Sequence, residues 1–320
     1  MIRIVFMGNG EFGIPTLRTL HENHHVAAVV TGRDTFKGRG RTLTSSPVKE
    51  AARTLGIEVI EPENLSDPIL IENLTTLDAD LFFVVAFRIL PKELFGIPPK
   101  GTVNLHASLL PDYRGAAPIN RAIINGDEVT GLTTFYIEKK VDTGDMLLSA
   151  QVSIGPDETA GELADRMKHV GAQLALDTVN GIEREILSAV KQPDTPRRPA
   201  PKLFKEHGRI DWSKDARSVH NQVRGMNPSP GAFSDWPRGP LKIHRTQIVD
   251  TESPGTPGLV TDSSPHAGFV VSCGTGKLRV LEVQPPGKKI MDAASFVRGY
   301  RIETGMFIDR KNEPQQHDDR

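Results

Sequence analysis

An amide and an imidazole lie two residues apart in the segment Asn104-Leu105-His106. The run Thr102–His106 predicts a strand, so Asn104 and His106 project from the same face of it. In an open α/β sheet, ligands bind beyond the carboxyl ends of the strands. An amide there can donate to a developing oxyanion, and an imidazole can move a proton near neutral pH. The pair indicates chemistry on a carbonyl, although such pairs also occur as caps or surface groups.

A carboxylate follows in the segment Val141-Asp142-Thr143-Gly144-Asp145, past the next predicted helix and strand. We expect Asp142 to lie on a turn, from which it can orient and polarise His106. The candidate catalytic group is therefore Asn104, His106 and Asp142.

A second candidate is the segment Gly8-Asn9-Gly10-Glu11-Phe12-Gly13, which matches the dinucleotide-binding pattern G-x-G-x-x-G. It follows a predicted strand and opens a predicted helix, as that pattern requires. Asp34 comes about 20 residues after the last glycine, where an acidic residue can hold a ribose hydroxyl. The alternative is a tight turn whose glycines allow close packing of strand and helix. The segment by itself leaves a nicotinamide cofactor open.

The elements that must position these groups alternate in the first half of the chain. Near-continuous apolar runs such as Val26–Val30 and Leu81–Val85 suit strands that are covered on both faces of a parallel sheet. Strand and helix patterns together predict a doubly wound α/β domain. Strands are expected at 2–7, 26–31, 59–61, 81–87 and 102–106, and helices at 14–20, 47–55, 68–77, 117–125 and 160–186.

The second half of the chain has a different pattern. Residues 190–203, VKQPDTPRRPAPKL, are dense in proline and charge, which favours an extended linker. A short helix is expected at 216–224, and short strands separated by Pro, Gly and Ser clusters predict a small barrel. We therefore expect a catalytic domain at 1–189, a linker at 190–208 and a second domain at 209–320.

The bulk properties exclude several classes of protein. The single cysteine, Cys273, rules out an internal disulfide and a thiolate zinc site. The longest apolar run, Leu81–Phe87, is far short of the roughly 20 residues of a membrane helix. The net charge is −1, without a general basic field, but residues 201–320 have a small basic excess that hints at a polyanionic partner. We expect a soluble, cytoplasmic monomer without membrane attachment.

Longer segments resemble a known family. The run NLHASLLPDYRGAAPINRAIINGD, the later VDTGDML and the segments PAPKLF, VRGMNPSPGAF and GKKIMDAASFVRGY resemble methionyl-tRNA formyltransferases in order and spacing. The resemblance covers nearly the whole chain. It implies an α/β fold in which a Rossmann-like formyltransferase domain with a parallel-rich sheet precedes a linker and a C-terminal OB-like β-barrel that binds tRNA.

The resemblance also implies a reaction. A formyl group would pass from 10-formyltetrahydrofolate to the α-amine of initiator methionyl-tRNA, which releases tetrahydrofolate and supports translation initiation. No metal and no NAD would be needed. Where this chain has Asn9-Gly10 the family usually has Thr-Pro, so the glycine fingerprint looks accidental.

The same resemblance assigns residues. Asn104, His106 and Asp142 match the family's catalytic positions. Arg39, in the loop sequence GRGR, matches a loop that meets the acceptor stem of the tRNA. Four residues match the folate-binding loop: Ser108, Leu109, Leu110 and Pro111.

Three alternatives stay open. A folate-dependent formyltransferase acting on a nucleotide-linked amino sugar would share the Asn–His–Asp group. A nicotinamide oxidoreductase would use Gly8, Gly10 and Gly13. A non-catalytic RNA-binding protein would use the barrel, although the complete Asn–His–Asp group argues against it.

Overall fold

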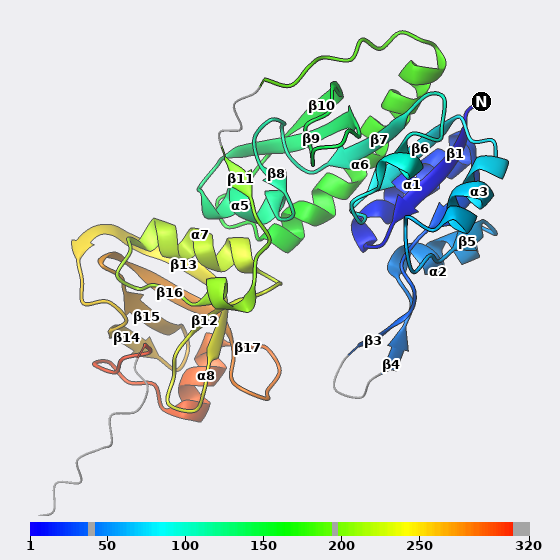
Figure 1. Ribbon diagram of the computed structural model, residues 1–320. Coiled ribbons are helices and arrows are strands. Elements are labelled where there is room, and N and C mark those ends of the chain that lie inside the picture. The colour runs from blue at the N-terminus through cyan, green and yellow to red at the C-terminus, as the bar shows by residue number, and fades with distance from the viewer. Residues whose placement is uncertain (38–41, 194–197, 310–320) are drawn as a thin grey trace, which may run out of the picture. The chain divides into compact units, whose positions relative to one another are not determined.

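The computed structural model describes residues 1–37, 42–193 and 198–309 (Figure 1). They form two compact units, and each unit takes its chain from three segments. Unit 1 contains residues 1–118, 129–153 and 164–201. Unit 2 contains residues 119–128 and 154–163 together with the chain from residue 202 onward.

A seven-stranded mixed sheet forms the centre of unit 1, in the order β10-β9-β7-β6-β1-β2-β5 (Figure 1). The pairs from β5 to β7 are parallel, whereas β9 runs antiparallel to β7 and β10. The predicted parallel-rich α/β sheet is thus confirmed. The strands are β1 (Arg3–Gly8), β2 (His25–Val30), β5 (Glu58–Ile60), β6 (Leu81–Val85), β7 (Thr102–His106), β9 (Val129–Tyr136) and β10 (Met146–Ser153).

Two helices of unit 1, α2 and α3, begin at residues whose side chains satisfy a free N–H group of the first turn. Ser46 accepts a hydrogen bond from the Lys49 N–H, and Asp67 accepts one from the Ile69 N–H. A proline follows each of these caps, at a position where no N–H is needed. The helices are η1 (Glu11–Gly13), α1 (Ile14–Asn23), α2 (Pro47–Thr54), α3 (Pro68–Thr76), α4 (Lys92–Phe95) and most of α6 (Ala160–Glu183).

The long helix α6 lies against the sheet through a glycine. A Cβ added at Gly171 would come within 2.9 Å of Leu105 in β7 and 3.0 Å of Leu132 in β9. A side chain at this position would displace the ends of these two leucines, so the glycine lets α6 pack closely over the strand that carries Asn104 and His106.

Two small pairs of strands were not predicted. An antiparallel hairpin, β3 (Thr35–Lys37) and β4 (Thr42–Thr44), extends away from the sheet (Figure 1). A short parallel pair joins β8 (Arg114–Gly115) to β11 (Pro199–Ala200), so the expected linker contributes a strand to unit 1.

Unit 2 is built on an antiparallel sheet in the order β12-β13-β16-β15-β14, with β17 paired to β16. Strands β13, β14, β15 and β16 correspond to the predicted C-terminal strands, whereas β12 and β17 were not predicted. The closure of the sheet into an OB-like barrel stays a prediction. The strands are β12 (Ala232–Ser234), β13 (Leu241–Pro254), β14 (Val260–Ser264), β15 (Gly268–Ser272), β16 (Thr275–Gln284) and β17 (Met291–Asp292). The helices are α5 (Pro118–Ile124), η2 (Lys205–Gly208), α7 (Ala216–Met226) and α8 (Ala293–Tyr300).

Both tryptophans of the chain lie in unit 2. Trp212 is buried, and its indole N–H donates to the Ser234 hydroxyl at 2.9 Å. Trp236 packs against Phe296 and Tyr300, with ring centroids 5.4 and 5.3 Å away. These aromatic rings anchor the apolar core of the unit.

In the described part of the chain, no helix combines the length and the apolar character that crossing a membrane requires.

Candidate active site

The strand β7 carries two of the three candidate catalytic residues. It pairs with β6 on one side and β9 on the other, which fixes its position in the sheet. Asn104 is half-buried, and within the described ranges its side-chain amide has no hydrogen-bond partner. An amide held on a sheet strand without an internal partner is available to a ligand.

A backbone carbonyl determines which ring nitrogen of His106 carries a proton. The ring is buried, and its Nε2 lies 2.8 Å from the carbonyl oxygen of Tyr113. Because a carbonyl only accepts hydrogen bonds, Nε2 is the nitrogen that carries a proton. In the neutral ring, the lone pair therefore resides on Nδ1. The ring also stands edge-on to Phe135, with an interplanar angle of 82°.

Asp142 faces this lone pair. Its Oδ2 lies 3.9 Å from His106 Nδ1, which is too long for a hydrogen bond. The same oxygen accepts a hydrogen bond from the Gly115 N–H at 2.9 Å. The structure thus brings His106 and Asp142 together, and it places Asn104 on the same strand face as His106.

The turn that holds Asp142 has an unusual backbone. Asp142 has a φ of 54°, in the left-handed region that residues with a side chain rarely adopt. Two residues later, a Cβ at Gly144 would lie 1.7 Å from the Tyr136 carbonyl oxygen. The turn packs so tightly against the end of β9 that only glycine fits, which keeps Asp142 in place.

A residue that the sequence analysis missed supports this turn. The side chain of Gln192 is buried, and its Nε2 donates to the carbonyl oxygens of Asp142 and Gly144 at 3.1 and 2.7 Å. Its Oε1 accepts two hydrogen bonds from Arg114, at 3.0 and 2.6 Å. A lone glutamine in a proline-rich segment gives no signal in the sequence, so only coordinates could find it.

The expected folate-binding loop directly follows His106. Thr133 in β9 secures it, since its hydroxyl donates to the Ser108 carbonyl at 2.8 Å and accepts from the Leu110 N–H at 3.1 Å. The Ser108 hydroxyl donates to the Asp112 carbonyl at 2.6 Å. Ser108 and Leu110 are buried, Leu109 is half-buried, and the Leu110–Pro111 peptide bond is cis.

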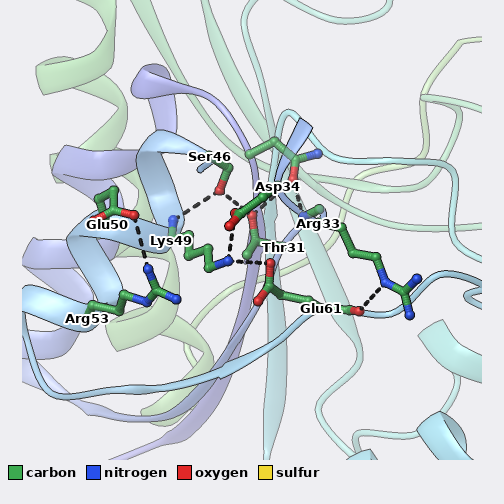
Figure 2. Close-up of polar contacts among 10 residues, drawn as sticks. Thr31, Arg33, Asp34, Ser46, Lys49, Glu50, Arg53 and Glu61 are labelled. Atoms are coloured by element: carbon green, nitrogen blue, oxygen red, sulfur yellow. Dashed lines mark hydrogen bonds and ion pairs between the residues drawn. The ribbon is translucent and has the colours of Figure 1, made fainter. Parts of the chain in front are cut away.

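Arg39, the residue expected to meet the tRNA, lies outside the described residues. The strands β3 and β4, which flank it in the sequence, lie next to a group of polar contacts around Lys49 (Figure 2). Lys49 of α2 is 3% exposed, and its Nζ lies 2.6 Å from Asp34 Oδ1 and 2.7 Å from Glu61 Oε1. The hydrogen bonds to Asp34 and Glu61 raise the pKa of the Lys49 ammonium. The hydrogen bond from Lys49 likewise lowers the pKa of Asp34.

Packing involves the first and last glycines of the fingerprint, Gly8 and Gly13, most tightly at Gly8, whereas a Cβ at Gly10 would meet nothing within 4 Å. A Cβ at Gly8 would lie 3.0 Å from the Val85 carbonyl, and one at Gly13 would lie 3.4 Å from the Phe6 ring. Asp34, the candidate ribose ligand, is paired with Lys49. Both observations agree with the tight-turn alternative. In the described part of the chain, no group of three or more His, Cys, Asp or Glu side chains is arranged around a metal site.

The chain matches two family models. The model described as "Formyl transferase" matches residues 2–179, and "Formyl transferase, C-terminal domain" matches residues 202–301. The chain is 45% identical over 308 residues to the methionyl-tRNA formyltransferase of Trichlorobacter lovleyi, covering 96% of each chain. It is 46% identical over 313 residues to that of Citrifermentans bemidjiense, covering 97% of this chain and 98% of the relative.

Solved structures share the fold at low sequence identity. One is WlaRD, a sugar 3N-formyl transferase, with a TM-score of 0.65 and 18% identity over 90% of this chain and 99% of that chain. Another is HypX from Aquifex aeolicus in complex with tetrahydrofolic acid, with a TM-score of 0.64 and 17% identity over 99% of this chain and 50% of that chain.

The fold, the position of the Asn–His–Asp group and these matches define a folate-type formyltransferase class. The chain belongs to the formyltransferase family, within the group of the methionyl-tRNA formyltransferases. The family resemblance expected from the sequence motifs is confirmed.

Proposed function

We propose that this protein transfers the formyl group of 10-formyltetrahydrofolate to the α-amine of methionyl-tRNA. The observation that carries the proposal is the near-full-length similarity to methionyl-tRNA formyltransferases in a chain whose structure gathers His106 and Asp142 beside the Asn104 strand. The product would be the formylated initiator tRNA that translation initiation uses.

The reaction is an acyl transfer. The uncharged amine attacks the formyl carbon, so a carbon–nitrogen bond forms and a tetrahedral oxyanion develops. The bond between the formyl carbon and N10 of the folate then breaks. The proton lost by the amine goes to N10, which leaves as tetrahydrofolate. Orienting two bound reactants can lower such a barrier by as much as about 7–11 kcal/mol.

The three side chains have distinct parts in this proposal. Asn104 donates a hydrogen bond to the oxyanion through an amide that has no partner in the described part of the chain. His106 assists from the same strand face, with its Nε2 proton held by the Tyr113 carbonyl. Asp142 faces His106 Nδ1 and relays the amine proton toward N10.

The surrounding segments would bind the two substrates. The loop of Ser108, Leu109, Leu110 and Pro111 would hold the folate, and the sequence between β3 and β4, which includes Arg39, would contact the acceptor stem. We also propose residues 1–189 as the catalytic domain, 190–208 as a linker and 209–320 as the tRNA-binding domain, in a cytoplasmic monomer.

The decisive experiment mixes the protein with 10-formyltetrahydrofolate and methionyl-tRNA and measures formylmethionine released from the tRNA. Uncharged tRNA should give no product. A nucleotide-linked amino sugar in place of the tRNA tests the alternative acceptor, whose class of enzyme shares this fold. Formylation of the sugar without formylation of methionyl-tRNA would overturn the proposal.

A further inference from the structure

Gln192 lies in the stretch of chain between the two matched family models, which end at residue 179 and begin again at residue 202. Its side chain is only 4% exposed. An amide side chain offers two donors and an oxygen with two lone pairs. Gln192 uses all four, through two hydrogen bonds to backbone carbonyls and two from Arg114.

One end of the amide holds the turn of Asp142. Nε2 donates to the carbonyl of Asp142, which is the left-handed residue, and to the carbonyl of Gly144 two residues later. A left-handed backbone at a residue with a side chain is costly and persists only when its surroundings fix it. Gln192 supplies two of these fixing contacts from a distant part of the chain.

The other end of the amide binds Arg114, which directly follows the residue that contacts His106. Oε1 accepts from the Arg114 guanidinium, and Arg114 stands between two residues that contact the candidate catalytic pair. The carbonyl of Tyr113 binds His106 Nε2, and the N–H of Gly115 binds the Asp142 carboxylate. Arg114 and Gly115 are also the two residues of β8 that pair with β11 in the same linker.

We propose that Gln192 is a positioning residue for the formyl-transfer reaction, and that it sets the placement of the Asp142 carboxylate relative to His106. The linker would then contribute a positioning residue to the candidate active site in unit 1. This inference rests on the proposed catalytic part of Asp142. It predicts that the loss of the Gln192 amide leaves substrate binding nearly unchanged and slows the chemical step.

Two substitutions separate this effect from a loss of folding. Gln192→Glu keeps the shape and gives Arg114 a charged partner, but it places an acceptor against the carbonyls of Asp142 and Gly144. Gln192→Met keeps a similar volume and removes every hydrogen bond. A displacement of about 1 Å at a reacting group costs on the order of 10²-fold in rate, so kcat should fall by about that factor in both variants.

The KM for 10-formyltetrahydrofolate should stay within about twofold of wild type, because neither variant removes a uniform binding contact. Thermal melting reports folding of each variant. The matched control is Gln173→Glu on α6, which should leave kcat unchanged. The exposed Gln173 amide donates to Asp177, its one partner among the described residues. A folded Gln192→Glu enzyme with wild-type kcat would overturn the inference.

A double-mutant cycle with Asp142→Asn identifies the path of the effect. If Gln192 acts through the Asp142 carboxylate, Gln192→Met should cost little further rate once that carboxylate is gone. Equal losses in both backgrounds would mean that Gln192 acts elsewhere and would refute the inference. A wild-type rate for Asp142→Asn alone would instead show that the proposed catalytic part of Asp142 is wrong.

Discussion

The side-chain amide of Asn104 makes no hydrogen bond to another described residue of the protein. It is half-buried on β7. The chain therefore keeps an amide on the sheet strand that precedes the loop proposed to bind folate. Its neighbour His106 differs, because its Nε2 is bound to Tyr113 and only Nδ1 is left toward Asp142.

Asn104→Ala should lower kcat by about 10²–10³-fold, since losing one oxyanion donor costs roughly 2.7–4 kcal/mol. The melting temperature should barely change, because no internal hydrogen bond is removed. Steady-state formylation assays and thermal melting check both expectations. Asn73→Ala, at an exposed position of α3, is the matched control. A rate loss below tenfold would contradict the assigned part of Asn104.

His220 gives unit 2 a dependence on pH. The ring is 3% exposed, with Nε2 3.2 Å from the Pro156 carbonyl and Nδ1 2.9 Å from the Thr246 hydroxyl. Because the carbonyl only accepts, Nε2 is protonated and Nδ1 accepts from Thr246 in the neutral ring. Burial lowers the pKa of His220. The Pro156 hydrogen bond and the Asp157 carboxylate, 3.3 Å from Nε2, oppose this shift only in part.

Stability should therefore fall as the pH drops below about 6.5, the ordinary pKa of histidine. In that range the unfolded chain takes up a proton that the folded chain still resists, so protonation favours unfolding. Urea midpoints at pH 7.5 and 5.5 measure the effect. His220→Gln should reduce the difference without abolishing it, because burial also lowers the pKa of His24 and of His244. An unchanged difference would contradict this account.

At the scale of elements, the hairpin β3–β4 is joined to the sheet through a compact polar base (Figure 2). The Ser46 hydroxyl caps α2 and lies 2.7 Å from the Thr31 hydroxyl, directly after β2. The Lys49 ammonium binds Asp34, which precedes β3, and Glu61, which follows β5. One buried cation thus ties the hairpin to the carboxyl edge of two strands.

Lys49→Met should raise the KM for methionyl-tRNA by about tenfold, equivalent to a loss of about 1.4 kcal/mol in binding. The reason is that the hairpin proposed to contact the acceptor stem loses its attachment. The KM for 10-formyltetrahydrofolate should not change. Arg53→Met removes a positive charge from the same helix, at an exposed ion pair with Glu50, and is the control. Equal effects of the two variants would indicate a general charge effect instead.

The sequence predicted the elements that have strong apolar periodicity. Strands β1, β2, β6 and β7 and helices α1, α2 and α6 lie where buried runs or helical spacing placed them. The hairpin β3–β4 was missed because its strands are short and carry exposed apolar residues, such as Phe36 and Leu43, without a buried face.

The sequence predicted which residues form the candidate site, but not the distances and contacts between them. Asn104, His106 and Asp142 could be chosen from motifs, because their chemistry and strand ends are local properties. The 3.9 Å separation of His106 and Asp142, the left-handed turn and the Tyr113 carbonyl depend on packing. Gln192 contacts residues 48 to 78 positions away in the chain, which no local pattern reveals.

At the scale of the whole molecule, unit 2 borrows two segments from the first half of the chain. Asn120 in α5 donates to the Gly225 carbonyl at 2.7 Å. The Arg224 guanidinium donates to the carbonyls of Gly155 and Glu158 at 3.1 and 3.2 Å. Arg245 pairs with Glu162. The compact unit therefore does not begin at the linker.

A fragment that begins at Lys202 should be markedly less stable than unit 2 in the intact chain. It lacks both borrowed segments, so the buried Arg224 loses carbonyl partners, at a cost of roughly 1–3 kcal/mol for each unsatisfied group. Urea unfolding followed by circular dichroism, on the fragment and on the intact protein, checks this. Equal midpoints for the fragment and for the C-terminal transition of the intact protein would show that the borrowed segments are dispensable.

The two tryptophans, Trp212 and Trp236, confine the tryptophan fluorescence of the protein to unit 2. Unit 1 contains the candidate active site and has no indole, because both indoles of the chain are in unit 2. Tryptophan emission, excited selectively, therefore follows the loosening of the C-terminal core around Ser234 and Phe296. A tryptophan introduced near β7 would add a second optical channel, so that the order in which the two units come apart could be timed within a single sample.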